Sequence, residues 1–437
     1  MKKLLALAFV ASLGYLITVK ATPPGLGDSA ESLTYEKDIV PIFQKKCEQC
    51  HREGGIAPMS LVGYQEVRPW TRSIREKVIT RAMPPFNASG SIGYFERDPR
   101  LTQDEINTVV RWVDGGSKRG TPPAERPKIE WPNEWQSGKP DLVLRMKQPY
   151  DIRAGTVDDY ELFDLNYSFP VDTWIQGIEI RPGNRREVHH ASLYILPDRL
   201  KPQPDGRLDP NADGQSGGDD VFIIGGQLLL NWVPGSLPRK YEDDVAFMIP
   251  KGTRLGLQVH YAPTQQAQID QSEVGIYYSN GVIRKVARSL YGGTDHIDIP
   301  PGAENYQLID YRKFKTDATI FAFAAHMHLR GKSFEVKLIY PDGKTETVFD
   351  VPHFSFNWQR LYTLARPITV PKGTVAEYIA VWDNSSKNKY NPDPSQQVKF
   401  GGRTRDEMMS GTILYHVPDE KLAMKVVRGV QVEQAKN

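Results

Sequence analysis

Two short runs of side chains that bind metals stand out in the sequence. "AAHMHLRG" places His326 and His328 on either side of one methionine, and "KKCEQCHREGG" contains Cys47, Cys50 and His51. Successive side chains of a β-strand point to opposite faces, so positions i and i+2 share a face and can bind one ion. The same spacing also suits two half-buried histidines with backbone partners. Other motifs in the chain must decide between the two interpretations.

The Cys-x-x-Cys-His spacing at Cys47, Cys50 and His51 is the attachment motif of a c-type haem, in which two thiols bond to the vinyl groups and the histidine is the proximal iron ligand. A redox disulfide would need a βαβ setting, and a zinc site would need more soft ligands nearby. The sequence therefore predicts covalent haem c. Its distal ligand is commonly a methionine. Met83 in "TRAMPPF" is preferred to Met59 in "GGIAPMSL", because two prolines stiffen the loop behind Met83.

Five other histidines lie in three short contexts typical of β-strands: "REVHHASLYIL" with His189 and His190, "LGLQVHYAP" with His260, and the run with His326 and His328. Adjacent histidines face opposite ways in a regular strand. To share one ion, His189 and His190 need a bulge, a strand end or different ring nitrogens. A methionine pair in "GGRTRDEMMSG" adds soft thioether ligands that suit Cu(I), whereas imidazole suits copper in both oxidation states. These residue types indicate copper.

The order of these motifs along residues 141–432 resembles a known family, the copper type II, ascorbate-dependent monooxygenases, which include peptidylglycine and dopamine hydroxylases. The resemblance rests on six pieces taken together: "VHHASLYIL", "LNWVPGS", "LQVHYAP", "AHMHLRGK", "VWDNSSKNKYNPDP" and "RDEMMSG". It implies two jelly-roll β-domains that face each other across a solvent-filled cleft, with one copper ion in each. The residues that hold the substrate in the animal enzymes have no match here.

The resemblance also implies which residues bind the two copper ions. An electron-transfer copper is expected at three histidines: His189, His190 and His260. An oxygen-binding copper is expected at two histidines and a methionine: His326, His328 and Met408. Met408 is preferred to Met409 because the methionine directly after "DE" fills the position that the family uses.

The segment that carries the haem motif is expected to be helical over residues 32–116. "LTQDEINTVVRWVDGG" opens with a capping box, Thr102 and Glu105, continues with apolar residues at helical spacing and ends at Gly115. An earlier helix is expected to lead into the cysteine pair. This segment resembles the small class I cytochromes c, which carry their distal methionine late in the domain, and this is a second reason to prefer Met83.

Residues 117–140 are rich in proline and charge and predict a linker. Short strands divided by turn residues follow, such as "SFEVKLIYPDGKTETVFDV", a hairpin with Asp-Gly at its turn. The predicted architecture is multidomain: an all-α cytochrome c domain at 32–116, then two all-β jelly-roll sandwich domains at 141–288 and 289–432.

The composition excludes a nucleic-acid partner, because 55 basic and 53 acidic residues are interspersed and the net charge is only +2. Residues 1–21 are typical of a secretory signal peptide, with two lysines, an apolar run and a small residue at Ala21. The alternative is an uncleaved N-terminal anchor, which would be the only membrane contact. We expect an exported protein, periplasmic or extracellular. Cys47 and Cys50 are the only cysteines, so the disulfides of the animal enzymes are absent.

We therefore predict a copper-dependent monooxygenase that hydroxylates a C–H bond of a small-molecule or peptide-like organic substrate with O2. An external donor reduces the haem, and the haem passes electrons one at a time to the copper at His189, His190 and His260. A short Pro-rich linker would raise the effective concentration of donor near acceptor. Two alternatives stay open: a non-catalytic copper and haem electron-transfer protein, and a β-sandwich binding module with a cytochrome c domain and structural histidines.

Overall fold

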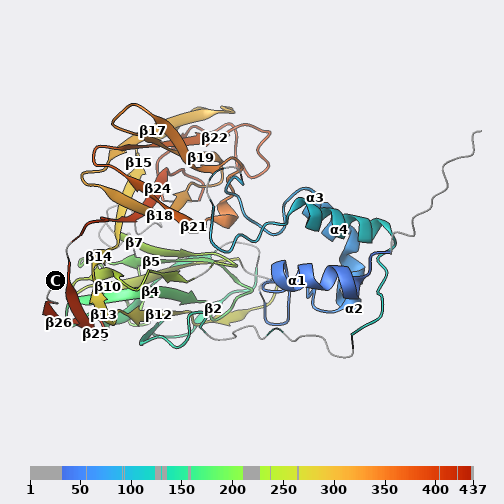
Figure 1. The fold of residues 1–437 in the computed structure, drawn as a ribbon, viewed down its shortest axis with the longest axis horizontal. Helices are drawn as coiled ribbons and strands as arrows, with labels where there is room; N and C mark the ends of the chain where they lie inside the picture. Colours follow the sequence, from blue (N-terminus) through green and yellow to red (C-terminus); the bar gives the residue numbers. More distant parts are fainter. Residues whose placement is uncertain are drawn as a thin grey trace, which may run out of the picture.

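The computed structural model describes residues 32–434 except for positions 56, 91, 93, 124–128, 130–134, 156–158, 210–226, 237, 263–264, 403 and 421. The expected signal peptide, residues 1–21, lies outside this range. The described residues form three parts, which are a helical unit and two β-sandwiches stacked beside it (Figure 1). Within the described ranges, no helix is both long enough and apolar enough to span a bilayer.

The helical unit contains the haem motif. Its elements are η1 (Tyr35–Ile39), α1 (Val40–Lys46), α2 (Tyr64–Val67), η2 (Arg68–Trp70), α3 (Thr71–Ile79) and α4 (Gln103–Asp114). The predicted capping box is confirmed, because Thr102 Oγ1 accepts from the Glu105 amide at 3.1 Å and Glu105 Oε2 accepts from the Thr102 amide at 2.8 Å. The expected helix before the cysteines is α1, which buries Val40, Ile42 and Phe43.

The first sandwich packs two sheets over one apolar core. One sheet has the order β1 (Leu142–Arg145), β12 (Glu273–Tyr278), β4 (Thr173–Arg181), β9 (Val245–Ile249) and β14 (Lys285–Val286), with β8 (Arg239–Lys240) also paired to β4. The other has the order β6 (Arg207–Leu208), β3 (Asp159–Ser168), β10 (Arg254–Tyr261), β5 (Val188–Ile195) and β7 (Gln227–Trp232). A small sheet joins β2 (Tyr150–Ile152) to β11 (Gln268–Asp270).

The first strand of the second sandwich begins at Arg288, two residues after the end of β14. One of its sheets has the order β15 (Arg288–Gly293), β24 (Ser410–His416), β18 (Ala318–His326) and β21 (Tyr362–Val370). The other sheet has the order β17 (Tyr306–Lys313), β22 (Val375–Trp382), β19 (Gly331–Ile339) and β20 (Thr345–Val351). A two-stranded sheet pairs β16 (Asp298–Ile299) with β23 (Val398–Lys399), and η3 (Phe356–Trp358) precedes β21. The Asp-Gly hairpin is confirmed as β19 and β20, with Gly343 in the left-handed region at φ 85°.

The end of the chain returns to the first sandwich (Figure 1). Strands β25 (Met424–Val427) and β26 (Val430–Gln434) form a sheet with β13 (Gly281–Ile283). Met424 and Val426 pack with Ala246 and Ile283 of the first sandwich. The predicted domain at 289–432 included these strands, but their hydrogen bonds and apolar contacts join them to the preceding domain.

A segment of the helical unit packs into the second sandwich. We call the described residues of 85–96 the strap. The Ser89 amide donates to the Asp350 carbonyl at 2.7 Å, and the Glu96 amide donates to the Thr363 carbonyl at 2.9 Å. Ala88 and Phe95 are buried in the second sandwich's core. The helical unit is therefore attached directly to the second sandwich (Figure 1). The sequence predicted only a linker at residues 117–140 and gave no sign of this contact.

Candidate metal centres

The first candidate centre lies where two neighbouring strands of the first sandwich meet. His189 and His190 come from β5, and His260 comes from β10. The pairing of these strands shifts after the His260–His190 pair, because Tyr261 pairs with Val188 and His189 is the extra residue. A β-bulge of this kind re-aims side chains. It allows two adjacent histidines to approach the same point, which a regular strand forbids.

The three imidazoles of this triad converge through one kind of ring nitrogen. His190 Nδ1 lies 3.3 Å from His189 Nδ1 and 3.2 Å from His260 Nδ1. One nitrogen from each ring lies within 4.8 Å of the others. Three lone pairs at this spacing can bind one cation, since imidazole ligates through Nδ1 or Nε2. The arrangement suits a copper ion with three nitrogen ligands.

The surroundings of His190 favour its neutral form. Burial, then the neighbouring His260 and His189, hold the pKa of His190 well below its usual value. A neutral imidazole offers a lone pair to a metal at neutral pH, whereas an imidazolium does not. The ring of Tyr160 stacks on His260 with centroids 4.0 Å apart and an interplanar angle of 8°. This stacking fixes the orientation of the His260 ring.

The second candidate centre lies at the end of β18 in the second sandwich. His326 is the last residue of β18, and His328 follows it after Met327. Met327 is fully buried in the core, while the rings of His326 and His328 lie with their centroids 5.1 Å apart. The alternation of side chains predicted from His-x-His is therefore present, with the methionine inside and the two histidines together.

Each histidine of the second centre uses Nδ1 for a protein partner. His326 Nδ1 lies 2.5 Å from Gln359 Oε1, and His328 Nδ1 lies 3.1 Å from the carbonyl oxygen of Asp406. Both partners are acceptors, so each Nδ1 carries the proton. Hydrogen bonds of this kind set the tautomer and orientation of a metal-binding histidine. Nε2 is then the nitrogen of each ring that can bind a metal, in contrast to Nδ1 at the triad.

Met408 lies beside this pair because β24 is paired with β18. His326 is opposite Ser410, two residues after Met408. Met408 lines the same cavity as His326 and His328, whereas Met409 packs into the hydrophobic core. The structure thus places Met408, rather than its neighbour, with the two histidines.

Glu407 connects two segments of the second centre by hydrogen bonds. Its carboxylate accepts from the backbone amides of His328 at 2.9 Å and Arg330 at 2.7 Å, and from Trp382 Nε1 at 2.9 Å. Glu407 is completely buried, and burial raises its pKa to about 7. One carboxylate therefore links the loop that carries His328 to the residue before Met408.

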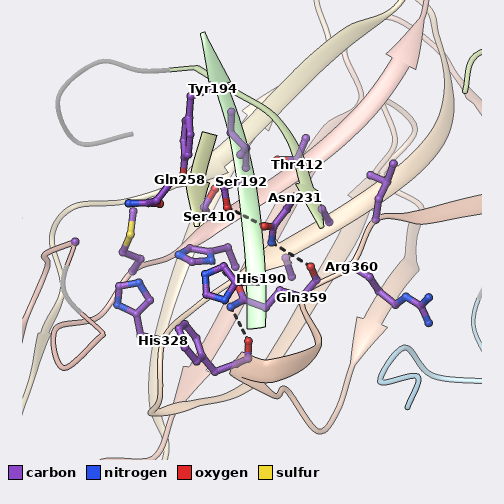
Figure 2. Close-up of a pocket in the computed structure, with 18 of the residues that line it drawn as sticks. His190, Ser192, Tyr194, Asn231, Gln258, His328, Gln359, Arg360, Ser410 and Thr412 are labelled. Atoms are coloured by element: carbon purple, nitrogen blue, oxygen red, sulfur yellow. Dashed lines mark hydrogen bonds between the residues drawn. The ribbon is translucent and has the colours of Figure 1, made fainter. Parts of the chain in front are cut away.

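The two centres border one small cavity of about 140 Å³ that lies between the sandwiches. Figure 2 shows His190 and His328 on its wall, with Ser192, Asn231, Ser410 and Thr412. The ring of Phe356 meets both His190 and His328 edge to face, with centroids 5.8 Å away in each case. One phenylalanine side chain therefore reaches across the space between the two centres.

The Cys-x-x-Cys-His motif follows α1 directly. The thiols of Cys47 and Cys50 are both free, and burial raises the pKa of both, that of Cys47 to about 12. His51 Nδ1 lies 3.2 Å from the carbonyl oxygen of Met59, so Nδ1 carries the proton and Nε2 can bind a metal. Burial lowers the pKa of His51. Two free thiols and one neutral, oriented imidazole fit covalent haem attachment.

The two methionines near this motif are placed differently. Met59 packs against the core of the helical unit, and its carbonyl oxygen contacts His51 on the Nδ1 side of the ring. Met83 follows α3, is 37% exposed and precedes the strap. No hydrogen bond or ring contact in the described residues joins Met83 to His51.

The sequence did not reveal the residues that surround the candidate metal-binding side chains. Phe356 is the first residue of η3, and Gln359 and Arg360 lie between η3 and β21, in a stretch without a recognisable motif. Asn231 was visible within "LNWVPGS" and Glu407 within "RDEMMSG", but their partners were not. Each of these residues acts through a tertiary contact with another strand, and a single sequence contains no signal for such contacts.

The part of the chain that contains the second candidate centre is similar to a known protein family. Residues 288–433 match the family model "copper type II ascorbate-dependent monooxygenase, C-terminal domain". His326, His328 and Met408 lie within the matched range, and the triad lies outside it.

Relatives of known identity match a longer part of the chain. Dopamine beta-hydroxylase of Canis lupus familiaris is 23% identical over 261 residues, which cover 56% of this chain and 40% of that protein. Tyramine beta-hydroxylase of Caenorhabditis briggsae is 22% identical over 255 residues, which cover 55% of this chain and 41% of that protein. The chain therefore spans about two fifths of the length of these relatives.

A likeness to a solved structure is much weaker. The infectious bursal disease virus VP2 subviral particle matches over 64% of this chain and 73% of its own, at 10% identity and a TM-score of 0.19. A score this low carries no argument about the fold.

Proposed function

We propose that this protein is an exported copper-dependent monooxygenase whose electrons come from a c-type haem on the same chain. The observation that carries the proposal is the pair of imidazole sets on one cavity. One set converges through Nδ1, and the other presents Nε2 beside a methionine. We further propose that both sandwiches are jelly rolls and that each holds one copper ion.

Copper bound at these sites would supply one-electron redox chemistry and activation of dioxygen. The overall reaction consumes a C–H bond, O2, two electrons and two protons, and it yields the C–OH product and one water. The structure constrains the organic substrate only through the size and polarity of the cavity. A C–H group must reach a cavity of about 140 Å³ that also contains Ser192, Asn231 and Thr412 as polar partners.

The protein's own residues would orient the two sites. Gln359 and the Asp406 carbonyl fix the ring directions of His326 and His328, and Tyr160 fixes that of His260. Phe356 reduces the space for water between the centres. Exclusion of water strengthens electrostatic interactions inside the cavity and limits side reactions.

The haem part of the proposal depends on the helical unit. Cys47 and Cys50 would carry the thioether bonds and His51 would be the proximal ligand. Met83 is proposed as the distal ligand. The backbone carbonyl of Met59 accepts a hydrogen bond from Nδ1 of His51, so Met59 already has a role in orienting the proposed proximal ligand.

Metal analysis with electron paramagnetic resonance tests the function. The purified protein should contain about two copper ions per haem, both with nitrogen ligands in the oxidised state. Oxygen uptake by the reduced protein should require an organic substrate, and a copper chelator should abolish this uptake while the covalent haem remains. Copper without substrate-dependent uptake would instead favour an electron carrier, and absence of copper would leave the histidines structural.

The distal haem ligand can be decided by two matched variants. Met83→Ala should abolish the near-infrared sulfur-to-iron absorption band of the oxidised haem, because the thioether is removed from the iron. Met59→Ala should keep the band, since only its backbone carbonyl contacts His51. Survival of the band in Met83→Ala, with its loss in Met59→Ala, would reverse the assignment.

A further inference from the structure

A wide groove separates the loop after α1 from one end of the first sandwich. Its volume is about 930 Å³, against about 140 Å³ for the cavity between the two candidate metal centres. The described residues of 52–60 form most of one wall, and residues 181–186, which lead from β4 to β5, form most of the other. Figure 1 shows α1 beside the end of the first sandwich that carries β2. None of the proposed copper-binding residues lines this groove, so the proposed reaction leaves it without a role.

Positive charge is in excess on the walls of the groove. Three glutamates are among the described residues that line it, together with five arginines: Arg52, Arg145, Arg181, Arg185 and Arg186. Glu273 serves two of these arginines at once, because its carboxylate pairs with both Arg145 and Arg181. A second glutamate, Glu66, accepts from a backbone amide at the start of α2. Two of the three carboxylates are therefore already committed to other partners.

Arg185 is the arginine that the protein does not match with an anion. Its residue is half-buried, and no hydrogen bond or ion pair joins it to any of the described residues. Burial, then the charges of Arg52 and Arg181, lower the pKa of Arg185, whereas Glu179 acts in the opposite direction. The oxygens of Glu179 are already used, since they accept from two backbone amides at 2.7 and 3.2 Å and from the Tyr277 hydroxyl at 2.9 Å. A half-buried charge without a partner costs free energy, so an anion from outside the chain is the expected partner.

The backbone holds Arg52 and Arg185 in place on opposite walls. The Gly55 amide donates to the Arg52 carbonyl at 2.9 Å and closes a turn directly after the haem motif. On the other wall, Asn184 Oδ1 accepts from the backbone amides two and three residues further on, at 3.2 and 3.3 Å. Arg52, Arg181 and Arg185 also line an adjoining cavity of about 80 Å³, so these three side chains gather at one place.

We propose that the groove binds a small oxyanion with two negative charges, held between Arg52 of the helical unit and Arg185 of the first sandwich. A planar guanidinium binds a carboxylate or a phosphate through two parallel hydrogen bonds. No aromatic ring is among the described residues that line the groove, so nothing there would stack on a nucleobase. A dicarboxylate and inorganic phosphate share the required chemistry. The inference goes beyond the proposed function and depends on neither copper nor haem.

An anion held in this way would connect two parts of the molecule. In its absence, the like charges of Arg52, Arg181 and Arg185 repel one another. A bound anion replaces this repulsion with attraction, so it should stabilise the folded protein. The effect of Arg185 on stability therefore depends on whether the anion is present. An arginine with a purely structural role would not behave in this way.

Calorimetric titration of the purified full-length protein measures binding directly. Succinate and inorganic phosphate are the probes, at low salt and a pH of about 8, where phosphate carries two charges, and acetate is the singly charged comparison. At least one of the two dianions should bind more tightly than acetate, and added NaCl should weaken this binding because salt screens exposed charges. The dianion that binds more tightly identifies the site as one for carboxylates or for phosphate. If neither dianion binds, the proposal is overturned.

Variants of Arg185 locate the site. Arg185→Gln should weaken binding by about 10- to 100-fold, the loss expected when hydrogen bonds between charged partners are removed. Arg185→Lys keeps the charge but not the planar fork, so its affinity should fall between. Arg72→Gln is the matched control and should bind as the wild type does, because Arg72 is exposed on α3 and does not line the groove. Unchanged affinity in Arg185→Gln would mean that the anion binds elsewhere.

Urea unfolding separates an anion site from a structural role of Arg185. Without anion, Arg185→Gln should unfold at the same or a higher urea concentration than the wild type, because it removes a half-buried charge that has no partner. Saturating dianion should raise the midpoint of the wild type and of Arg72→Gln, but not that of Arg185→Gln. A lower midpoint of Arg185→Gln in the absence of anion would show that Arg185 stabilises the fold by itself, and this result would also overturn the proposal.

Discussion

Replacing His326 with alanine should reduce substrate oxygenation by more than about 100-fold, because even the loss of an outer partner of a metal-bound histidine costs about 10–100-fold. The variant loses one of the two imidazoles that present Nε2 beside Met408. It should retain the triad, whose residues lie on strands of the other sandwich. The copper content should therefore fall from about two to about one per haem.

His296→Ala is the matched control, because His296 belongs to the same sandwich and its side chain is 92% exposed. This variant should keep both copper ions and full activity. Measurement of product formation, copper content and the haem spectrum in both variants separates loss of a ligand from loss of fold. Full oxygenation by His326→Ala would remove His326 from the catalytic centre.

Removing the carboxylate of Glu407 should cost about 3–5 kcal/mol of unfolding free energy, as expected when one partner of a buried charged network is deleted. The alanine variant leaves two backbone amides and the indole N–H of Trp382 without their acceptor. It also removes the carboxyl group whose charge acts most strongly on the guanidinium of Arg330, which is 2% exposed. Urea unfolding should show the midpoint falling sharply.

The same variant should lose copper from the second centre, since Glu407 joins the His328 loop to the residue before Met408. Glu304→Ala is the control, because Glu304 forms an exposed ion pair with Lys387 in the same sandwich. Such pairs contribute little to stability, so its midpoint should not move. An unchanged midpoint in Glu407→Ala would mean that water or a shifted side chain replaces the carboxylate.

Local patterns in the sequence identified many of the elements. The capping box of α4, the Asp-Gly hairpin of β19 and β20 and the alternation around Met327 each depend on residues near one another in the chain, so the sequence contains them directly. The bulge at His189 was expected as one of three possibilities and is the one observed. The assignment of metals to these residues stays a prediction.

Features that depend on distant contacts could not be predicted. The narrow cavity exists because Phe356, from a short 3₁₀ turn, reaches both His190 and His328. The strap enters the second sandwich because Phe86 and Phe95 pack against the aromatic rings of Tyr362 and Phe349. Nothing in the local sequence of either segment specifies its partner. The return of β25 and β26 to the first sandwich is of the same kind.

The strap limits how far this chain can be treated as interchangeable modules. Excising the helical unit at residues 117–140 would also strip Ala88 and Phe95 from the second sandwich and expose its aromatic rings. The core of the second sandwich is thus completed by the strap, which precedes both sandwiches in the sequence. Moving the helical unit onto another protein would require the surface of the second sandwich that receives the strap to be moved with it.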